Sequence, residues 1–149
     1  MRARRVGTKA EFGLFHNERP IGHVDATSVS FVGFETRDDA ALAASAAHRA
    51  LTKRRRRQPH RMDHSGDFVI MDQASLPAVV ARAGVLATLL PPAPEKPGVD
   101  GWGFEIQLRP EEQFEVFAIA RARVIWRALR GTGIYRRMRQ FQPDAPLST

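Results

Sequence analysis

The stretch Trp102-Gly103-Phe104-Glu105-Ile106-Gln107-Leu108 alternates apolar residues with small or polar ones along its whole length. A period of two puts neighbouring side chains on opposite faces of an extended chain, so this stretch predicts a strand with one face against a core. The apolar face would carry Trp102, Phe104, Ile106 and Leu108. It is the strongest secondary-structure signal in the sequence, and helices are expected on both sides of it.

A helix is expected directly after this strand, because Pro110 suits the first position of a helix. It should run to Arg130 and end at Gly131-Thr132-Gly133. Before the strand, the apolar residues of 76–90 follow helical spacing and predict another helix, which is apolar on nearly every side. Such a helix needs cover on more than one side, and self-association would supply it.

The first helix of the chain is expected to begin after Thr36, a good N-cap residue followed by acidic residues, and to end near Arg56. Its small residues share one face and would let it lie close to a sheet. That face carries Ala40, Ala43, Ala44, Ala47 and Leu51.

Strands are also expected over residues 11–16, 21–25, 29–35 and 68–71, where β-branched and aromatic residues lie between turn signals. The order is several strands, then helix, strand, helix, strand and helix. An opening meander and a four-residue middle strand fit a parallel α/β sheet poorly. The sequence therefore predicts an α+β fold, with a small mixed or mainly antiparallel sheet of about four to five strands packed by three helices.

The chain has 149 residues, which suits a single domain covering 1–149. Within it, a basic arm (1–9) and a tail (143–149) are expected to be flexible, and residues 91–100 to form a proline-rich connector. There is no cysteine, no secretory signal and no apolar run of about 20 residues, so a cytoplasmic protein without a membrane span is expected.

The basic residues, which give a net charge of +7, gather in two clusters. Both stand near the ends of expected helices, where cations also suit the helix dipole. If the folded chain brought them together, they would attract a polyanion by releasing counterions. The first cluster contains Arg49, Lys53, Arg54, Arg55, Arg56 and Arg57. The second contains Arg123, Arg127, Arg130, Arg136, Arg137 and Arg139.

Two further features bear on binding. Single-strand binders interleave aromatic residues with basic ones, and the candidates for that role are Trp126, Tyr135 and Phe141. Arg121 falls on the expected core face of the last helix, together with Phe114 and Phe117. A buried arginine needs a partner, and either a structural ion pair with Glu35 or Glu105 or a pocket for an anionic ligand would satisfy it.

Signs of catalysis are sparse. His60 and His64 would share a face if residues 59–67 formed a helical turn, which makes them weak metal-ligand candidates. His16 and His23 could converge across a hairpin. No phosphate-binding glycine loop and no nucleophile elbow is present, so we expect no cofactor and lean against an enzyme.

Three interpretations remain open. The first is a non-catalytic basic binding module for nucleic acid or another polyanionic partner, such as an acidic protein. The second is a self-associating structural or regulatory domain, most simply a dimer, which rests on the apolar helix at 76–90 and on an apolar strip at Ile119, Ala122 and Trp126. The third is a small-ligand or enzymatic pocket around Arg121.

Overall fold

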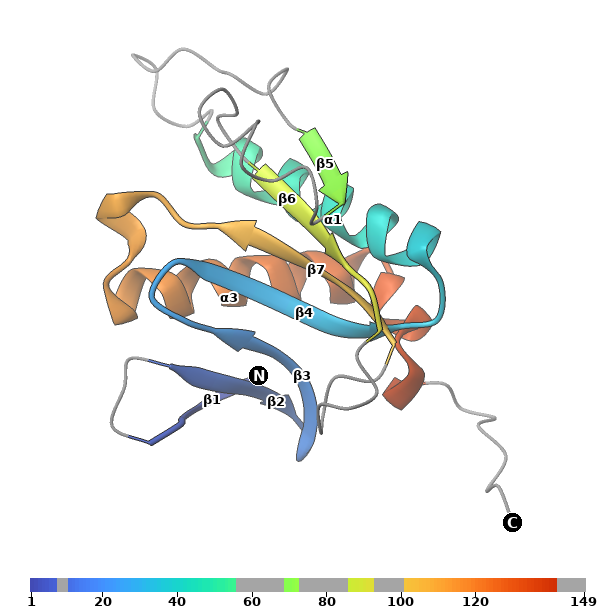
Figure 1. The fold of residues 1–149 in the computed structure, drawn as a ribbon, viewed down its shortest axis with the longest axis horizontal. Coiled ribbons are helices and arrows are strands. Elements are labelled where there is room, and N and C mark those ends of the chain that lie inside the picture. The colour runs from blue at the N-terminus through green and yellow to red at the C-terminus, as the bar shows by residue number, and fades with distance from the viewer. Residues whose placement is uncertain (8–10, 56–68, 73–85, 93–100, 142–149) are drawn as a thin grey trace.

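A computed structural model of the chain describes residues 1–7, 11–55, 69–72, 86–92 and 101–141 (Figure 1). The fold is α+β, as the sequence predicts. The strands are β1 (Arg2–Arg5), β2 (Phe12–His16), β3 (Arg19–Val24), β4 (Ser28–Phe34), β5 (Val69–Asp72), β6 (Leu86–Leu90) and β7 (Trp102–Gln107). The helices are α1 (Arg37–Arg55) and α3 (Glu115–Gly131), with short 3₁₀ turns η3 (Pro110–Glu112), η4 (Ile134–Arg137) and η5 (Arg139–Phe141).

The strands form one seven-stranded sheet in the order β1-β2-β3-β4-β7-β6-β5, which is larger than the four to five strands expected. Neighbours from β1 to β6 are antiparallel, and β5 alone runs parallel to its neighbour β6. β4 and β7 lie side by side at the centre, although α1, β5 and β6 separate them in the sequence. The predicted strand at 102–108 is confirmed as β7.

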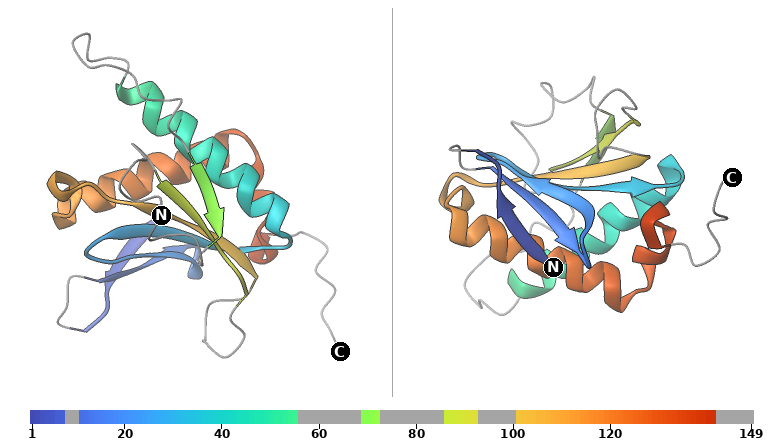
Figure 2. Two further views of the ribbon diagram at one scale, coloured as in Figure 1. Left: turned by 45° about the horizontal axis from the view of Figure 1, so that its top comes forward. Right: turned by 90° about the horizontal axis from the view of Figure 1, so that it is seen from below.

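Both α-helices lie on the same face of the sheet (Figures 1 and 2). α1 begins as predicted, because the Thr36 hydroxyl accepts a hydrogen bond from the backbone N–H of Asp39 at 3.1 Å. The expected small-residue face of α1, from Ala40 to Leu51, is buried against the sheet and α3. Within the described part of the chain, no helix is long and apolar enough to cross a membrane.

Aromatic side chains from the central strands fill the space under the helices. The rings of Phe31 on β4 and Phe104 on β7 stack with their centroids 5.9 Å apart, and the indole of Trp126 on α3 lies parallel to Phe31 at 6.2 Å. Phe34 lies next to Phe104 at 6.1 Å. Burial of such large rings stabilises the packing of α3 on the sheet.

A bulge near the end of β4 joins the C-terminal turns to the sheet. Gly33 has φ +101, which a side chain would strain, and the amide of Gln140 occupies the space that a Cβ would take. Phe34 then bridges to Met138, and the backbone N–H of Glu35 donates to the carbonyl of Arg137 at 3.3 Å. The basic segment after α3 is therefore held firmly against β4.

The prediction of a helix over 76–90 is wrong for residues 86–90, which form strand β6. Residues 76–85 lie outside the described part of the chain. Consecutive residues of β6 are buried, from Ala87 to Leu89, so both faces of this strand are covered. A strand buried on both faces reads as a nearly continuous apolar run, which is easily mistaken for a buried helix. The described residues therefore contain two α-helices rather than the three expected. The last helix also begins later than expected, because Pro110 opens the short turn η3 and α3 starts at Glu115.

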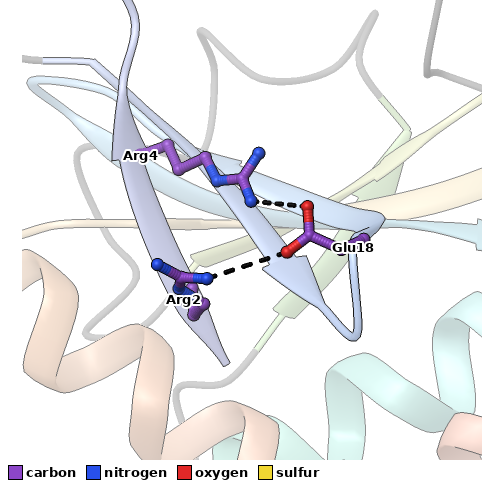
Figure 3. A network of polar contacts seen from close by, with 3 residues as sticks. All are labelled: Arg2, Arg4 and Glu18. Atoms are coloured by element: carbon purple, nitrogen blue, oxygen red, sulfur yellow. Dashed lines mark hydrogen bonds and ion pairs between the residues drawn. The ribbon is translucent and has the colours of Figure 1, made fainter.

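The prediction of a flexible basic arm at the N-terminus is also wrong for residues 2–5, which form the edge strand β1. Glu18, in the turn after β2, forms ion pairs with two arginines of β1 (Figure 3). Arg4 Nη2 donates to Glu18 Oε2 at 2.6 Å, and Arg2 Nη1 lies 3.7 Å from Glu18 Oε1. Arg5 forms an ion pair with Glu115, the first residue of α3. These charges also discourage another chain from pairing with the sheet edge.

Candidate functional site

Three arginines of the second cluster, which we call the α3 arginines, lie on the exposed side of α3: Arg123, Arg127 and Arg130. Their spacing of four and three residues places them along one face of the helix. The opposite face is buried against the sheet. Among the residues that the structure describes, neither Arg123 nor Arg127 has a carboxylate partner, so both charges face solvent.

The remaining arginines of the second cluster lie on η4 and η5 and are partly used within the fold. Arg137 Nη1 donates to Asp39 of α1 at 3.0 Å, and Arg139 Nε lies 3.5 Å from Glu35. Arg136 is exposed and donates from Nε to the Tyr135 hydroxyl at 3.4 Å, which lowers the pKa of that phenol. Arg137 and Arg139 therefore anchor the C-terminal turns, whereas Arg136 contributes to the positive charge of the surface.

The first cluster lies at the other end of α1. Arg137 contacts Asp39 in the first turn of that helix, whereas Lys53, Arg54 and Arg55 occupy its last turn. At about 1.5 Å per residue, roughly 20 Å of helix separates the two ends. Arg49 is exposed, and Arg56 and Arg57 lie outside the described residues. The last turn of α1 is therefore well separated from Arg137 and the C-terminal turns.

Four rings converge where α3 meets the C-terminal turns and the end of β2. We call them the ring cluster: His16, Trp126, Tyr135 and Phe141. Trp126 lies 5.1 Å from His16, 5.8 Å from Phe141 and 6.4 Å from Tyr135, measured between ring centroids. Tyr135 and Phe141 meet edge to face at 5.6 Å. The three aromatic residues named from the sequence thus come together.

Arginines lie over this ring cluster. The guanidinium carbon of Arg130 is 4.3 Å from the Tyr135 centroid and 6.0 Å from that of Trp126. Arg136 approaches Tyr135 at 5.8 Å, and Arg19 approaches Phe141 at the same distance. These are cation–π distances. Positive charge and flat rings are therefore combined at one end of α3.

The sequence interpretation missed His16 and Arg19 as members of this region. The alternation of Phe12, Leu14 and His16 was the available signal, since it puts His16 on the core side of β2. His23 pairs opposite Gly13, so it belongs to the other face of the sheet, and the expected convergence of the two histidines does not occur. Arg19 carried no sequence signal, because its position depends on the fold of the C-terminal turns.

The expected core face of α3 is also corrected. The buried residues are Ala118, Ala122, Ile125, Trp126 and Leu129, and they include two of the three residues assigned to a self-association strip. Phe114 and Phe117, which were expected inside, are 66% and 54% exposed. The helix is rotated relative to the expectation because Trp126 stacks on Phe31 and brings its own side of α3 to the sheet.

Arg121 consequently lies at the edge of the buried face, with its side chain 16% exposed. Its carboxylate partner is Glu112 of η3, and neither Glu35 nor Glu105 takes that role. Arg109 Nε approaches the same carboxylate at 3.9 Å. The ion pair fastens η3 to α3, which supports a structural role for Arg121.

We expect Arg121→Ala to lower the melting temperature by several degrees, because it leaves the largely buried Glu112 carboxylate without its closest cation. Thermal unfolding followed by circular dichroism measures the change. The double variant Arg121→Ala with Glu112→Ala should recover part of the loss, since it removes both charges. An unchanged melting temperature in the single variant would contradict the structural role.

The face of the sheet opposite the helices carries a row of polar residues. His23, Ser30, Glu105 and Thr88 lie opposite one another on β3, β4, β7 and β6. Burial and the nearby Asp25 raise the pKa of Glu105, while the Ser28 hydroxyl and His23 oppose that shift. No sequence signal marked this row, because its members are far apart in the chain.

Glu105→Gln is expected to raise the melting temperature by about 2–4 °C at pH 8, because the raised pKa means that ionising Glu105 costs stability in the folded state. Below the usual pKa of an unfolded glutamate, about 4.3, both proteins carry a neutral side chain and the difference should vanish. Melting curves from pH 4 to pH 8 test this sign. A stabilisation that is independent of pH would contradict the assigned cause.

The metal-ligand candidates His60 and His64 lie outside the described residues. Within the ranges that are described, no group of three or more metal-ligating side chains comes together. No protein-family model matches the chain, and searches of curated proteins and of solved structures find no match either.

Proposed function

We propose that this protein is a non-catalytic, cytoplasmic binding module for nucleic acid, and that it binds through the α3 arginines and through Arg136, which lies beside the ring cluster. The observation that carries the proposal is the charge pattern of this surface. Arg123 and Arg127 are exposed without a carboxylate partner in the described part of the chain, and Arg130 and Arg136 lie over aromatic rings. Elsewhere, β1, η4 and η5 pair several arginines with carboxylates.

Phosphate chemistry fits these side chains. A guanidinium presents a planar fork of donors that matches phosphate oxygens, and it stays charged at any physiological pH. A row of cations along one helix face suits a ligand whose negative charges also repeat along a line. Nucleic acid supplies such a row, and it releases bound counterions when its phosphates are neutralised. An acidic protein offers a less regular target, so it is the weaker form of the same proposal.

The first test is fluorescence anisotropy with labelled oligonucleotides and nuclease-treated protein across a salt series. We expect micromolar or tighter binding near physiological salt, with a logarithmic salt slope that reports several phosphate contacts. An acidic peptide with the same net charge as the oligonucleotide serves as a competitor. It distinguishes a preference for nucleic acid from binding to any polyanion. Absence of binding above low salt would overturn the proposal and leave the arginines as a solvated surface.

Self-association is a second candidate, favoured by a patch that the sequence did not indicate. Phe114, Val116 and Phe117 at the start of α3 are 54–69% exposed, and the rings of Phe114 and Phe117 contact each other edge to face. Neighbouring exposed apolar side chains of this size are typical of a contact surface. Sedimentation velocity over a hundredfold range of concentration distinguishes a dimer from a monomer.

A further inference from the structure

The ring cluster has more exposed aromatic surface than a core requires. Trp126 is only 6% exposed, but His16, Tyr135 and Phe141 are each partly open to solvent. They lie at the surface where the end of β2 and the two C-terminal turns meet. Flat rings that remain accessible beside cations form the kind of platform on which nucleic-acid bases stack.

Arg130 extends this platform. Its guanidinium carbon lies 4.3 Å from the Tyr135 ring centroid, so the planar group is held beside that ring. The residue itself is exposed, so a second flat group can approach it from solvent. An arginine already held beside a ring loses less conformational freedom when a base stacks on it. Arg130 therefore links the helix arginines, which suit phosphates, to the rings, which suit bases.

His16 adds a fourth ring to the cluster. Burial lowers its pKa, and the positive charges of the N-terminal amino group and of Arg130 lower it further. The lowered pKa favours the neutral imidazole, which offers a stacking surface and a hydrogen-bonding nitrogen rather than another cation. Its centroid lies 5.7 Å from that of Phe141, which continues the aromatic surface away from α3.

Only an unpaired base can use such rings. In a duplex each base is covered by its neighbours above and below, so a stacking platform on the protein reaches none of them except at an end. The phosphates of a duplex would still meet the α3 arginines. Exposed rings beside those arginines therefore favour a single strand over a duplex.

We infer that the ring cluster and Arg130 hold an unstacked base, and that the ligand of this protein is single-stranded nucleic acid. This inference rests on the proposed nucleic-acid binding and adds the class of strand. The α3 arginines neutralise the phosphates, and the base beside them stacks on the guanidinium of Arg130 or on the rings of Tyr135 and Phe141.

The test compares a labelled 20-nucleotide thymidine strand with a 20-base-pair duplex at the same salt concentration, using the full chain. The strand should bind at least about tenfold more tightly than the duplex. Tyr135→Leu should weaken strand binding by about tenfold, the loss expected for one stacked base, and should leave duplex binding and the salt slope unchanged. Equal affinity for strand and duplex, or a Tyr135→Leu variant that binds both as the natural chain does, would overturn the inference.

Phe114→Leu is the matched control, because it removes an exposed aromatic ring at the N-cap of α3, outside the ring cluster. Its strand affinity should equal that of the unmodified chain. If Tyr135→Leu melts at a much lower temperature, Arg130→Lys replaces it as the test. That variant keeps the charge but loses the planar group, and strand binding should weaken several-fold with no change in the salt slope.

The two proposals fail in different ways. If neither strand nor duplex binds, the nucleic-acid function itself is wrong. If both bind equally, with a steep salt slope and no effect of Tyr135→Leu, the function holds and the inference about single strands is wrong.

Discussion

Replacing Arg123, Arg127 and Arg130 together by glutamate is expected to weaken strand binding about a hundredfold near 0.1 M salt. Each phosphate contact contributes roughly 0.7 to the logarithmic salt slope of a single strand, so the loss of three contacts should lower that slope by about two. Anisotropy titrations at several salt concentrations give both numbers. The buried face of α3 is untouched, since all three side chains are exposed.

Single charge-reversal variants distinguish the contribution of the α3 arginines to binding from that of the net charge of the protein. Arg127→Glu and Arg49→Glu change the net charge equally, and both positions are exposed on helices. Arg127→Glu should cause the larger loss, because Arg49 lies towards the other end of α1 from the C-terminal turns. Equal losses would show that the protein attracts nucleic acid by its overall charge, and the α3 arginines would lose their special role.

Gly22→Ala is expected to destabilise the fold by at least about 3 kcal/mol, which lowers the melting temperature by roughly 10 °C. A Cβ built on Gly22 would lie 2.0 Å from the carbonyl oxygen of Ser30 on the neighbouring strand. The clash is with backbone, so it cannot be relieved by a side-chain rotation and β3 must move away from β4. Thermal or urea unfolding measures the loss.

Gly131→Ala is the control for this substitution. A Cβ on Gly131 meets no atom within 4 Å, and the residue ends α3. Alanine is a better helix former than glycine, so this variant should be as stable as the natural chain or up to about 1 kcal/mol more stable. If Gly22→Ala were tolerated equally well, the close approach of β3 and β4 would be wrong.

Local sequence signals predicted the elements that local interactions determine. Thr36 caps α1, the small residues of α1 face the sheet, and the alternation around Phe104 gives β7. Each of these depends on a period or a cap within a few residues. The sequence predicted too few strands, because residues 2–5 and 86–90 become strands only by pairing with β2 and β7, respectively.

The candidate site was predicted in its composition but not in its arrangement. Trp126, Tyr135 and Phe141 were named from the sequence, yet nothing in their spacing showed that three rings and His16 would meet. The orientation of α3 depends on the stacking of Trp126 on Phe31, a contact between residues on different elements. For the same reason the sequence could not choose Glu112 as the partner of Arg121.

The position of β7 has a consequence for how the chain folds as it is made. Strands β1 to β4 follow one another and can pair as soon as they are synthesised, but β4 receives its second neighbour only after α1, β5 and β6 have been added. Until then β4, which is buried along its whole length in the finished protein, has an unpaired edge. Pairing a central strand late slows folding, and until then its unpaired edge can pair with another chain. Nascent chains that stop before β7 should therefore be the form most prone to aggregate.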